Sequence, residues 1–400
     1  MIAMIDVIKG VARRISVTTR IAILLALVTT LGQSESIYFL WGHSQGLARP
    51  QWWFVFSLLN AIYVFSFVVM IWCVRRLSQL QAKWLSIGLA VVLSIGFAYI
   101  YPRFGAPTIG GFGDRDDALN LMAQSLIDWS NPYSNLTYLG QLVSPLLGSM
   151  ILGFPAYVLA GSAAWLNPVI VWAALLGGLR YLSAKAVLVL GIAMMVNYAM
   201  LSDFLLGGDA FTVPLLLALT IFSLLSSRVS ESPFVLAPLV LIGGLAGASR
   251  TYTVLVVVAV VLFVLARRRT SPKVTAIICM GAITASLTLA SLFLSGGPGS
   301  WPFTGYVDKG LRIAVSALVP LVMAWLIWVW RRTRRSGTID VFALTAPLLS
   351  FTFIPLVLAP GLLWRSWSYL ILGLPIVMKD LDTHFVQRTD SISQDAVKIQ

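Results

Sequence analysis

Long apolar stretches separated by short polar connectors recur along the sequence, from Ile21 to Met378. Each is about twenty residues long, which is the length that an α-helix needs to cross the hydrocarbon core of a bilayer. The stretches lack the alternation of polar and apolar residues that membrane β-barrel strands show. Because backbone amides in lipid must be satisfied within their own segment, the pattern predicts transmembrane helices. We place these helices at 21–41, 52–74, 84–101, 164–182, 186–202, 210–227, 233–249, 251–266, 274–295, 310–330, 339–359 and 366–379.

Composition supports this interpretation and sets the expected orientation. Of the 400 residues, 58% are hydrophobic and 11% are charged, which excludes a water-soluble fold. The net charge of +13 indicates no nucleic-acid partner, because the basic residues cluster in the connectors, where they favour the cytoplasmic side. With the N-terminus inside, the outward-facing basic residues are few: Arg49, Arg103, Arg115, Arg250, Lys309, Arg312 and Arg365. We therefore expect an all-α polytopic membrane protein with about 12 transmembrane helices and no soluble domain.

One apolar run, Ser144–Gly161, is not counted as a span because it contains Pro145 and Pro155. Proline inside a helix removes a backbone hydrogen bond, and a re-entrant or interfacial segment tolerates that loss better than a regular span does. In the alternative topology this run crosses the membrane, and 233–266 forms one long helix with Arg250 at its middle. The distribution of basic residues favours the first topology.

The longest polar stretch, 102–143, lies on the expected outer side. Asp114, Asp116 and Asp117 stand where a helix begins, a position that favours carboxylates. Apolar residues then recur with helical spacing, which predicts an amphipathic helix along the membrane surface that ends before Asn131-Pro132. These acids could simply cap and solvate a surface helix. Long loops are more often functional, however, and a second acidic group, Asp203 and Asp209, is expected on the same side.

The order of these features resembles the GT-C superfamily of integral-membrane glycosyltransferases. Four parts of this sequence carry the resemblance: Asp116, Asn120 and Ala123 in the surface helix, then Asn131-Pro132-Tyr133, then the run from Ser144-Pro145 to Gly161, then Asp203. The segment from Gly244 to Arg250 is similar to a small-residue segment of that family. Two features depart from the family pattern: two additional spans precede the acidic loop, and Asn120 stands where tyrosine is common.

The resemblance implies transfer of a sugar from a polyprenyl-phosphate carrier to a hydroxyl of a glycan or glycolipid, with inversion, at the outer face of the cytoplasmic (inner) membrane. A carboxylate suits the general base, and fixed cations suit the phosphate of the leaving group. The expected catalytic residues are Asp116, with Asp117 or Asp203 orienting the acceptor, and the expected phosphate ligands are Arg250 and Arg365. The expected contacts to acceptor or sugar are Asp114, Asn120, Tyr133, Asp209 and Trp364. For Arg250 and Arg365, the competing interpretations are snorkelling of the side chain to the membrane interface and structural pairing with an acid.

The sequence leaves a divalent cation between Asp116 and Asp203 open, since hard cations take carboxylate ligands. His43 and His384 stand alone, so no zinc site is predicted. The expected segments are 1–101 (three membrane helices), 102–163 (outer catalytic loop), 164–379 (remaining helices) and 380–400 (cytoplasmic tail). Two other classes of function remain: a secondary transporter, which would show related halves, and a polysaccharide polymerase or ligase, which would rely on outward arginines and a large later loop.

Overall fold

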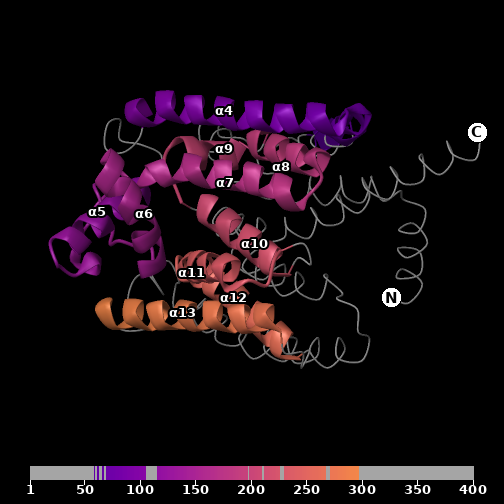
Figure 1. The fold of residues 1–400 in the computed structure, drawn as a ribbon. Helices are drawn as coiled ribbons and strands as arrows, with labels where there is room; N and C mark the ends of the chain where they lie inside the picture. Colours follow the sequence, from indigo (N-terminus) through magenta and orange to yellow (C-terminus); the bar gives the residue numbers. More distant parts are fainter. Residues whose placement is uncertain are drawn as a thin grey trace, which may run out of the picture.

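The computed structural model describes residues 69–104, 115–196, 198–209, 211–225, 229–266 and 271–296, together with 58, 61–62 and 65–66. In these ranges the regular structure is helical, and the only strand-like pairing is an isolated bridge between Leu136 and Leu142. The helices are α4 (Gln79–Phe104), α5 (Arg115–Ile127), η2 (Pro132–Ser134), α6 (Leu147–Ala160), η3 (Ala163–Trp165), α7 (Leu166–Tyr181), α8 (Ala184–Val196), α9 (Tyr198–Leu205), α10 (Thr212–Leu225), α11 (Pro233–Gly247), α12 (Thr251–Ala266) and α13 (Pro272–Leu294) (Figure 1).

Several predictions fall outside the described residues. They are the spans 21–41, 310–330, 339–359 and 366–379, most of 52–74, the tail 380–400, and the candidate site residues Asp114, Trp364 and Arg365.

Three described helices are long and apolar enough to cross a membrane: α4 with 26 residues, Ala163–Arg180 with 18 and α13 with 23. On α4, the buried positions Ala82, Ser86, Ala90, Leu93, Phe97 and Tyr101 follow one another at three- and four-residue intervals. The opposite side of α4 exposes large apolar side chains, including Leu80, Trp84, Val92 and Ile95. A soluble protein rarely exposes apolar surface of this extent, so the described part is that of a helical membrane protein.

The helices form two packed groups that share α10. In Figure 1, α4 lies along one side of α7, α8 and α9, and α13 lies along the opposite side with α11 and α12. Phe211, directly before α10, and Leu215 of α10 belong to the first hydrophobic cluster, with Phe97 of α4 and Leu190 of α8. Val213 and Leu217 of α10 belong to the second cluster, together with residues of α11, α12 and α13. The two faces of α10 therefore serve different cores.

The run with two prolines forms a single helix, α6, of 14 residues, which ends at Gly161 in the left-handed region (φ 76°). At about 1.5 Å per residue it extends about 21 Å, less than the roughly 30 Å hydrocarbon core. Residues 233–266 form two helices, α11 and α12, instead of the one long helix of the alternative topology. Helices α8, α10 and α11, with 13, 14 and 15 residues, are similarly short, so the length of α6 does not distinguish it from the predicted spans.

Backbone atoms join the start of α6 to the end of α11. Leu146 N donates to Ser249 O at 2.9 Å, and Gly148 N donates to Ala248 O at 2.9 Å. The chains approach so closely that a Cβ at Gly148 would lie 2.1 Å from the carbonyl oxygen of Leu245. Glycine is therefore required here because backbone fills the space that a side chain would need.

A helix, α5, is present where the amphipathic helix was predicted, and it ends before Asn131 as expected. Its apolar face packs against protein: Ala118 and Met122 form a small cluster with Tyr133, Leu147 and Met150. Helices α5 and α6 lie together at one end of the long helices (Figure 1).

Hydrogen bonds define the two ends of the helical assembly. At the end near α5, Tyr101 of α4 contacts Asp116, and Asn131 donates to the Leu294 carbonyl at the end of α13. At the other end, Lys185 of α8 donates to the Arg75 carbonyl. The acidic segments 115–146 and 203–212 therefore lie at the same end of the helices, which we call the acidic end.

Candidate functional site

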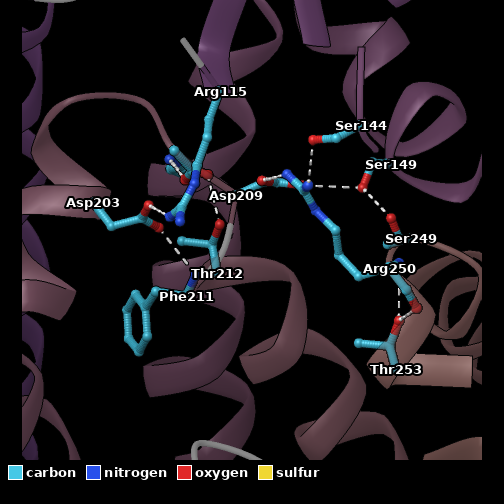
Figure 2. A network of polar contacts seen from close by, with 12 residues as sticks. Arg115, Ser144, Ser149, Asp203, Asp209, Phe211, Thr212, Ser249, Arg250 and Thr253 are labelled. Atoms are coloured by element: carbon cyan, nitrogen blue, oxygen red, sulfur yellow. Dashed lines mark hydrogen bonds and ion pairs between the residues drawn. The ribbon is translucent and has the colours of Figure 1, made fainter. Parts of the chain in front are cut away.

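An ion pair joins the start of α5 to the end of α9. Arg115 Nη1 lies 2.7 Å from Asp203 Oδ1, and the side chain of Asp203 is 7% exposed, compared with 38% for Arg115. The second oxygen of Asp203 accepts a hydrogen bond from Phe211 N at 3.0 Å. Gly208 lies directly on this carboxylate, since a Cβ there would be 2.1 Å from Oδ1. Figure 2 shows Arg115 reaching toward Asp203 from the neighbouring helix.

A second, more buried ion pair lies beside the first. Asp209 accepts from Arg250 Nε at 3.1 Å and also from Nη2, so the guanidinium contacts both carboxylate oxygens (Figure 2). Arg250 Nη1 donates to Ser144 Oγ at 3.1 Å, and Ser149 Oγ donates to Asp209 Oδ2 at 3.1 Å. Bidentate arginine–carboxylate geometry is among the stronger charge-assisted contacts. This pair links the loop before α6, the start of α10 and the α11–α12 junction.

Asp116 occupies the first turn of α5 and is 2% exposed. The Tyr101 hydroxyl donates to its Oδ2 at 3.2 Å. Burial raises the pKa of the Asp116 carboxyl to about 6, while backbone N–H groups at the helix start and the Tyr101 hydroxyl act in the opposite direction. A carboxyl with a pKa near 6 is suited to exchange protons near neutral pH, as a general base must.

Three other predicted site residues support the backbone or the core. Asp117 Oδ2 accepts from Tyr138 N at 2.8 Å, which holds the loop after η2. Asn120 Oδ1 accepts from Ala163 N at 2.8 Å, which ties α5 to η3. Tyr133 is 8% exposed, and its hydroxyl has no hydrogen-bond partner in the described part of the chain. Burial raises the pKa of Tyr133 to about 12.

The loop between α9 and α10 is held in place by Asn167 at the start of α7. Asn167 Nδ2 donates to Gly208 O at 2.8 Å, and Thr212 Oγ1 donates to Asn167 Oδ1 at 2.7 Å. Gly207 adopts φ 84°, a left-handed conformation that glycine accommodates without a side-chain penalty. The loop therefore holds Asp209 near Asp203, which lies in α9.

The structure brings Asp203, Asp209 and Arg250 of the predicted site into one network. Asp116, Asp117 and Asn120 lie on the adjoining helix, whose first residue, Arg115, belongs to that network. Sequence reasoning missed five polar partners in this region: Tyr101, Arg115, Ser144, Ser149 and Ser162. For Tyr101 a signal was available, because it ends an apolar span directly before the acidic stretch.

The arrangement combines two arginine–aspartate pairs with one buried carboxyl that contacts a hydroxyl. Among the described residues, no group of three or more His, Cys, Asp and Glu side chains is arranged to hold a metal ion. The site can therefore exchange a proton through Asp116 and offers fixed positive charge through Arg115 and Arg250.

No protein-family model, no curated protein and no solved structure matches this chain.

Proposed function

We propose that this chain is an inverting glycosyltransferase with a GT-C-like fold of about 12 transmembrane helices. It moves a sugar from a polyprenyl-phosphate donor to a hydroxyl of a glycan or glycolipid, at the outer face of the cytoplasmic (inner) membrane. The supporting observation is the buried Asp116 carboxyl at the acidic end, one residue from an arginine that pairs with Asp203. A base and fixed cations within one region are the parts that such a reaction needs.

In the proposed step, Asp116 accepts the proton of the acceptor hydroxyl as that oxygen attacks the anomeric carbon of the donor sugar. The bond between the anomeric carbon and the phosphate oxygen breaks, and its electron pair leaves with the polyprenyl phosphate. Attack from the face opposite the leaving group inverts the anomeric configuration. Asp116 ends the step protonated and returns its proton to water.

The leaving phosphate gains negative charge, so cations near it stabilise the transition state. Arg250 is held by Asp209 and Ser144, which fixes its guanidinium in position but also neutralises part of its charge. Arg115 is the more exposed of the two arginines, with 38% of its side chain accessible. We assign phosphate contact to Arg250 together with Arg365, and Arg115 is a further candidate for the same role.

A direct assay tests the proposal. The purified chain in lipid nanodiscs is supplied with a panel of polyprenyl-phosphate sugars and membrane glycolipid acceptors, and product is measured by mass spectrometry. We expect Asp116→Asn to lower the transfer rate by about 10²- to 10⁴-fold, the range typical for loss of a general base. Transfer by the unaltered protein should fall as the pH drops below about 6, because the protonated carboxyl cannot accept a proton.

The matched control is Asp128→Asn, since Asp128 lies just past the other end of α5, where Gln124 donates to it. This variant should transfer at the unaltered rate, and full activity of Asp116→Asn would remove Asp116 from the role of base. Glycans from cells with and without the gene separate the competing functions. Loss of one sugar supports the transferase, shortened polymers indicate a polymerase or ligase, and unchanged glycans indicate a transporter.

A further inference from the structure

A chain of hydrogen-bonded side-chain oxygens leads from Asp116 to Asn120. Tyr101 Oη lies 3.2 Å from Asp116 Oδ2 and 2.6 Å from Ser162 Oγ, and Ser162 Oγ lies 3.1 Å from Asn120 Oδ1. These four groups come from α5, the end of α4 and the residue before η3. Asp116, Tyr101 and Ser162 are each less than one-tenth exposed, whereas Asn120 is partly exposed.

A backbone N–H fixes the direction of hydrogen bonding at the Asn120 end of this chain. Ala163 N donates to the Asn120 side chain at 2.8 Å, so the atom facing it must be the amide oxygen. The same oxygen faces Ser162, which must therefore supply the hydrogen of that contact. Because a hydroxyl has one hydrogen, Ser162 then has none to offer Tyr101, and Tyr101 must donate to Ser162.

The same count of donated hydrogens determines the contact between Tyr101 and Asp116. If Tyr101 donates to Ser162, its contact with Asp116 is a hydrogen bond only when the carboxyl carries the proton and donates it. If Asp116 is ionised, Tyr101 turns to donate to it, and one contact further along the chain loses its hydrogen. Every contact is thus satisfied in the protonated state, whereas ionisation leaves one unsatisfied.

We propose that Tyr101 and Ser162 are positioning residues whose hydroxyls form a directional chain that reverses when Asp116 gains or loses its proton. This inference rests on the proposed function in one respect, namely that Asp116 is the base of the reaction. Tyr101 aids ionisation by donating to the carboxylate, and Ser162 opposes it by drawing the Tyr101 hydrogen away. The two residues therefore act on Asp116 in opposite directions although they belong to one network.

Substitutions at Tyr101 and Ser162 leave the other titratable groups near Asp116 in place. In the described part of the protein, the elements packed around α5 carry these: Asp117 and Arg115 on α5 itself, Tyr157 on α6, Tyr133 on η2, and Asp203 paired with Arg115. Tyr101 is suited to a conservative test because its ring stacks on Phe97, with centroids 5.0 Å apart, and phenylalanine preserves that contact.

The test is an infrared titration of the purified chain in nanodiscs, following the protonated-carboxyl band that disappears in Asp116→Asn. We expect Tyr101→Phe to move the midpoint of this band upward by about one pH unit, through loss of a donor to the carboxylate. We expect Ser162→Ala to move it downward by a similar amount, because Tyr101 then donates to Asp116 without competition. Tyr157→Phe and Ser125→Ala are the matched controls, and they should leave the midpoint unchanged.

Opposite shifts support the proposal. No shift, shifts in the same direction or shifts with the signs exchanged would overturn it, and Ser162→Ala alone decides if Tyr101→Phe does not fold. The titration needs no substrate, so its result is independent of whether the chain transfers sugars. If the protein shows the opposite shifts but transfers no sugar, the result supports the hydrogen-bond network and contradicts the proposed function.

Discussion

Arg115, in the first turn of α5, binds Asp203, at the end of α9, across 88 residues of sequence, with Nη1 and Oδ1 2.7 Å apart. This contact is the direct link between the acidic stretch that follows α4 and the acidic loop that precedes α10. It requires both acidic groups to lie at the same end of the helices. A shared location of this kind is the condition on which the proposed active centre depends.

We expect Arg115→Gln to lower the free energy of unfolding by about 1–2 kcal/mol, because it leaves the buried Asp203 carboxylate without its cation. The partial exposure of Arg115 keeps this cost below that of a fully buried pair. Adding Asp203→Asn should recover part of the loss, since a neutral amide needs no counter-ion. Denaturant titration in detergent of the unaltered chain, the two single variants and the double variant measures the coupling energy between Arg115 and Asp203.

Arg103→Gln is the control for this cycle. Arg103 lies near the end of α4 with its guanidinium over the exposed ring of Tyr99. We expect its loss to change stability by less than about 0.5 kcal/mol. If Arg115→Gln matches this control, the ion pair contributes nothing to folding.

The raised pKa of Asp116 predicts a dependence of stability on pH. Because the folded-state pKa is about 6 and the ordinary value is 3.8, folding favours the protonated carboxyl. The stability that the protonated Asp116 carboxyl contributes to the fold is fully present below the ordinary pKa and is lost as the pH rises through about 6. We therefore expect Asp116→Asn to be more stable than the unaltered chain above pH 6, by up to about 3 kcal/mol.

Thermal melts of Asp116→Asn and of the unaltered chain, recorded between about pH 4 and about pH 8, measure this difference in stability. The advantage of Asp116→Asn should shrink as the pH falls. Asp128→Asn, at the exposed end of α5, is the control variant. A constant difference across the range would mean that Asp116 does not titrate in this window.

Gly148→Ala should destabilise the protein by about 1–3 kcal/mol, because its Cβ would meet backbone atoms of Leu245 and Ala248 that cannot rotate away. Gly177→Ala provides a matched comparison on α7, where a Cβ would meet nothing within 4 Å. That variant should be neutral or stabilising by up to about 1 kcal/mol, since alanine favours helices. Equal melting temperatures for the two variants would argue against the close contact between α6 and α11.

Thiol labelling tests the expected orientation in the membrane. In a version without Cys73 and Cys279, a cysteine at Asp128 and another at Glu231 each occupy an exposed position. These positions lie at opposite ends of the helices: Asp128 follows α5 at the acidic end, and Glu231 precedes α11, whose far end reaches the acidic end. We expect an impermeant maleimide added to intact cells to label position 128 and to leave position 231 unlabelled until the cells are opened. Labelling of both positions, or of 231 alone, would contradict the outward acidic end.

Hydrophobic pattern was sufficient to predict most of the described helices. The range 84–101 corresponds to α4 and 274–295 to α13, because long apolar runs with clear polar limits leave few alternatives. The two prolines of Ser144–Gly161 predicted a re-entrant or interfacial segment, and the structure forms a helix of 14 residues, α6, in this run. The surface helix was also predicted, although its apolar face packs on α6 and η2.

The pairing of charges could not be predicted in this way. Helical periodicity indicates which face a side chain occupies, but not the rotation and depth at which two distant helices meet. The sequence therefore gave no reason to pair Arg250 with Asp209 instead of Asp203, or to connect Tyr101 with Asp116. The close approach at Gly148 was equally hidden, because a glycine in an apolar run carries no sign of its neighbour.

Helix α10 contributes residues to both hydrophobic clusters, so it acts as a common wall between two halves of the described region, which α6 also joins through its contacts with η3 and α11. Local unfolding of α10 would expose both hydrophobic clusters at the same time, because Leu215 packs in one cluster and Leu217 in the other. We therefore expect the described region to melt as a single cooperative unit. The loop that carries Asp209 leads directly into α10, so this part of the acidic end is anchored to an element that packs in both clusters.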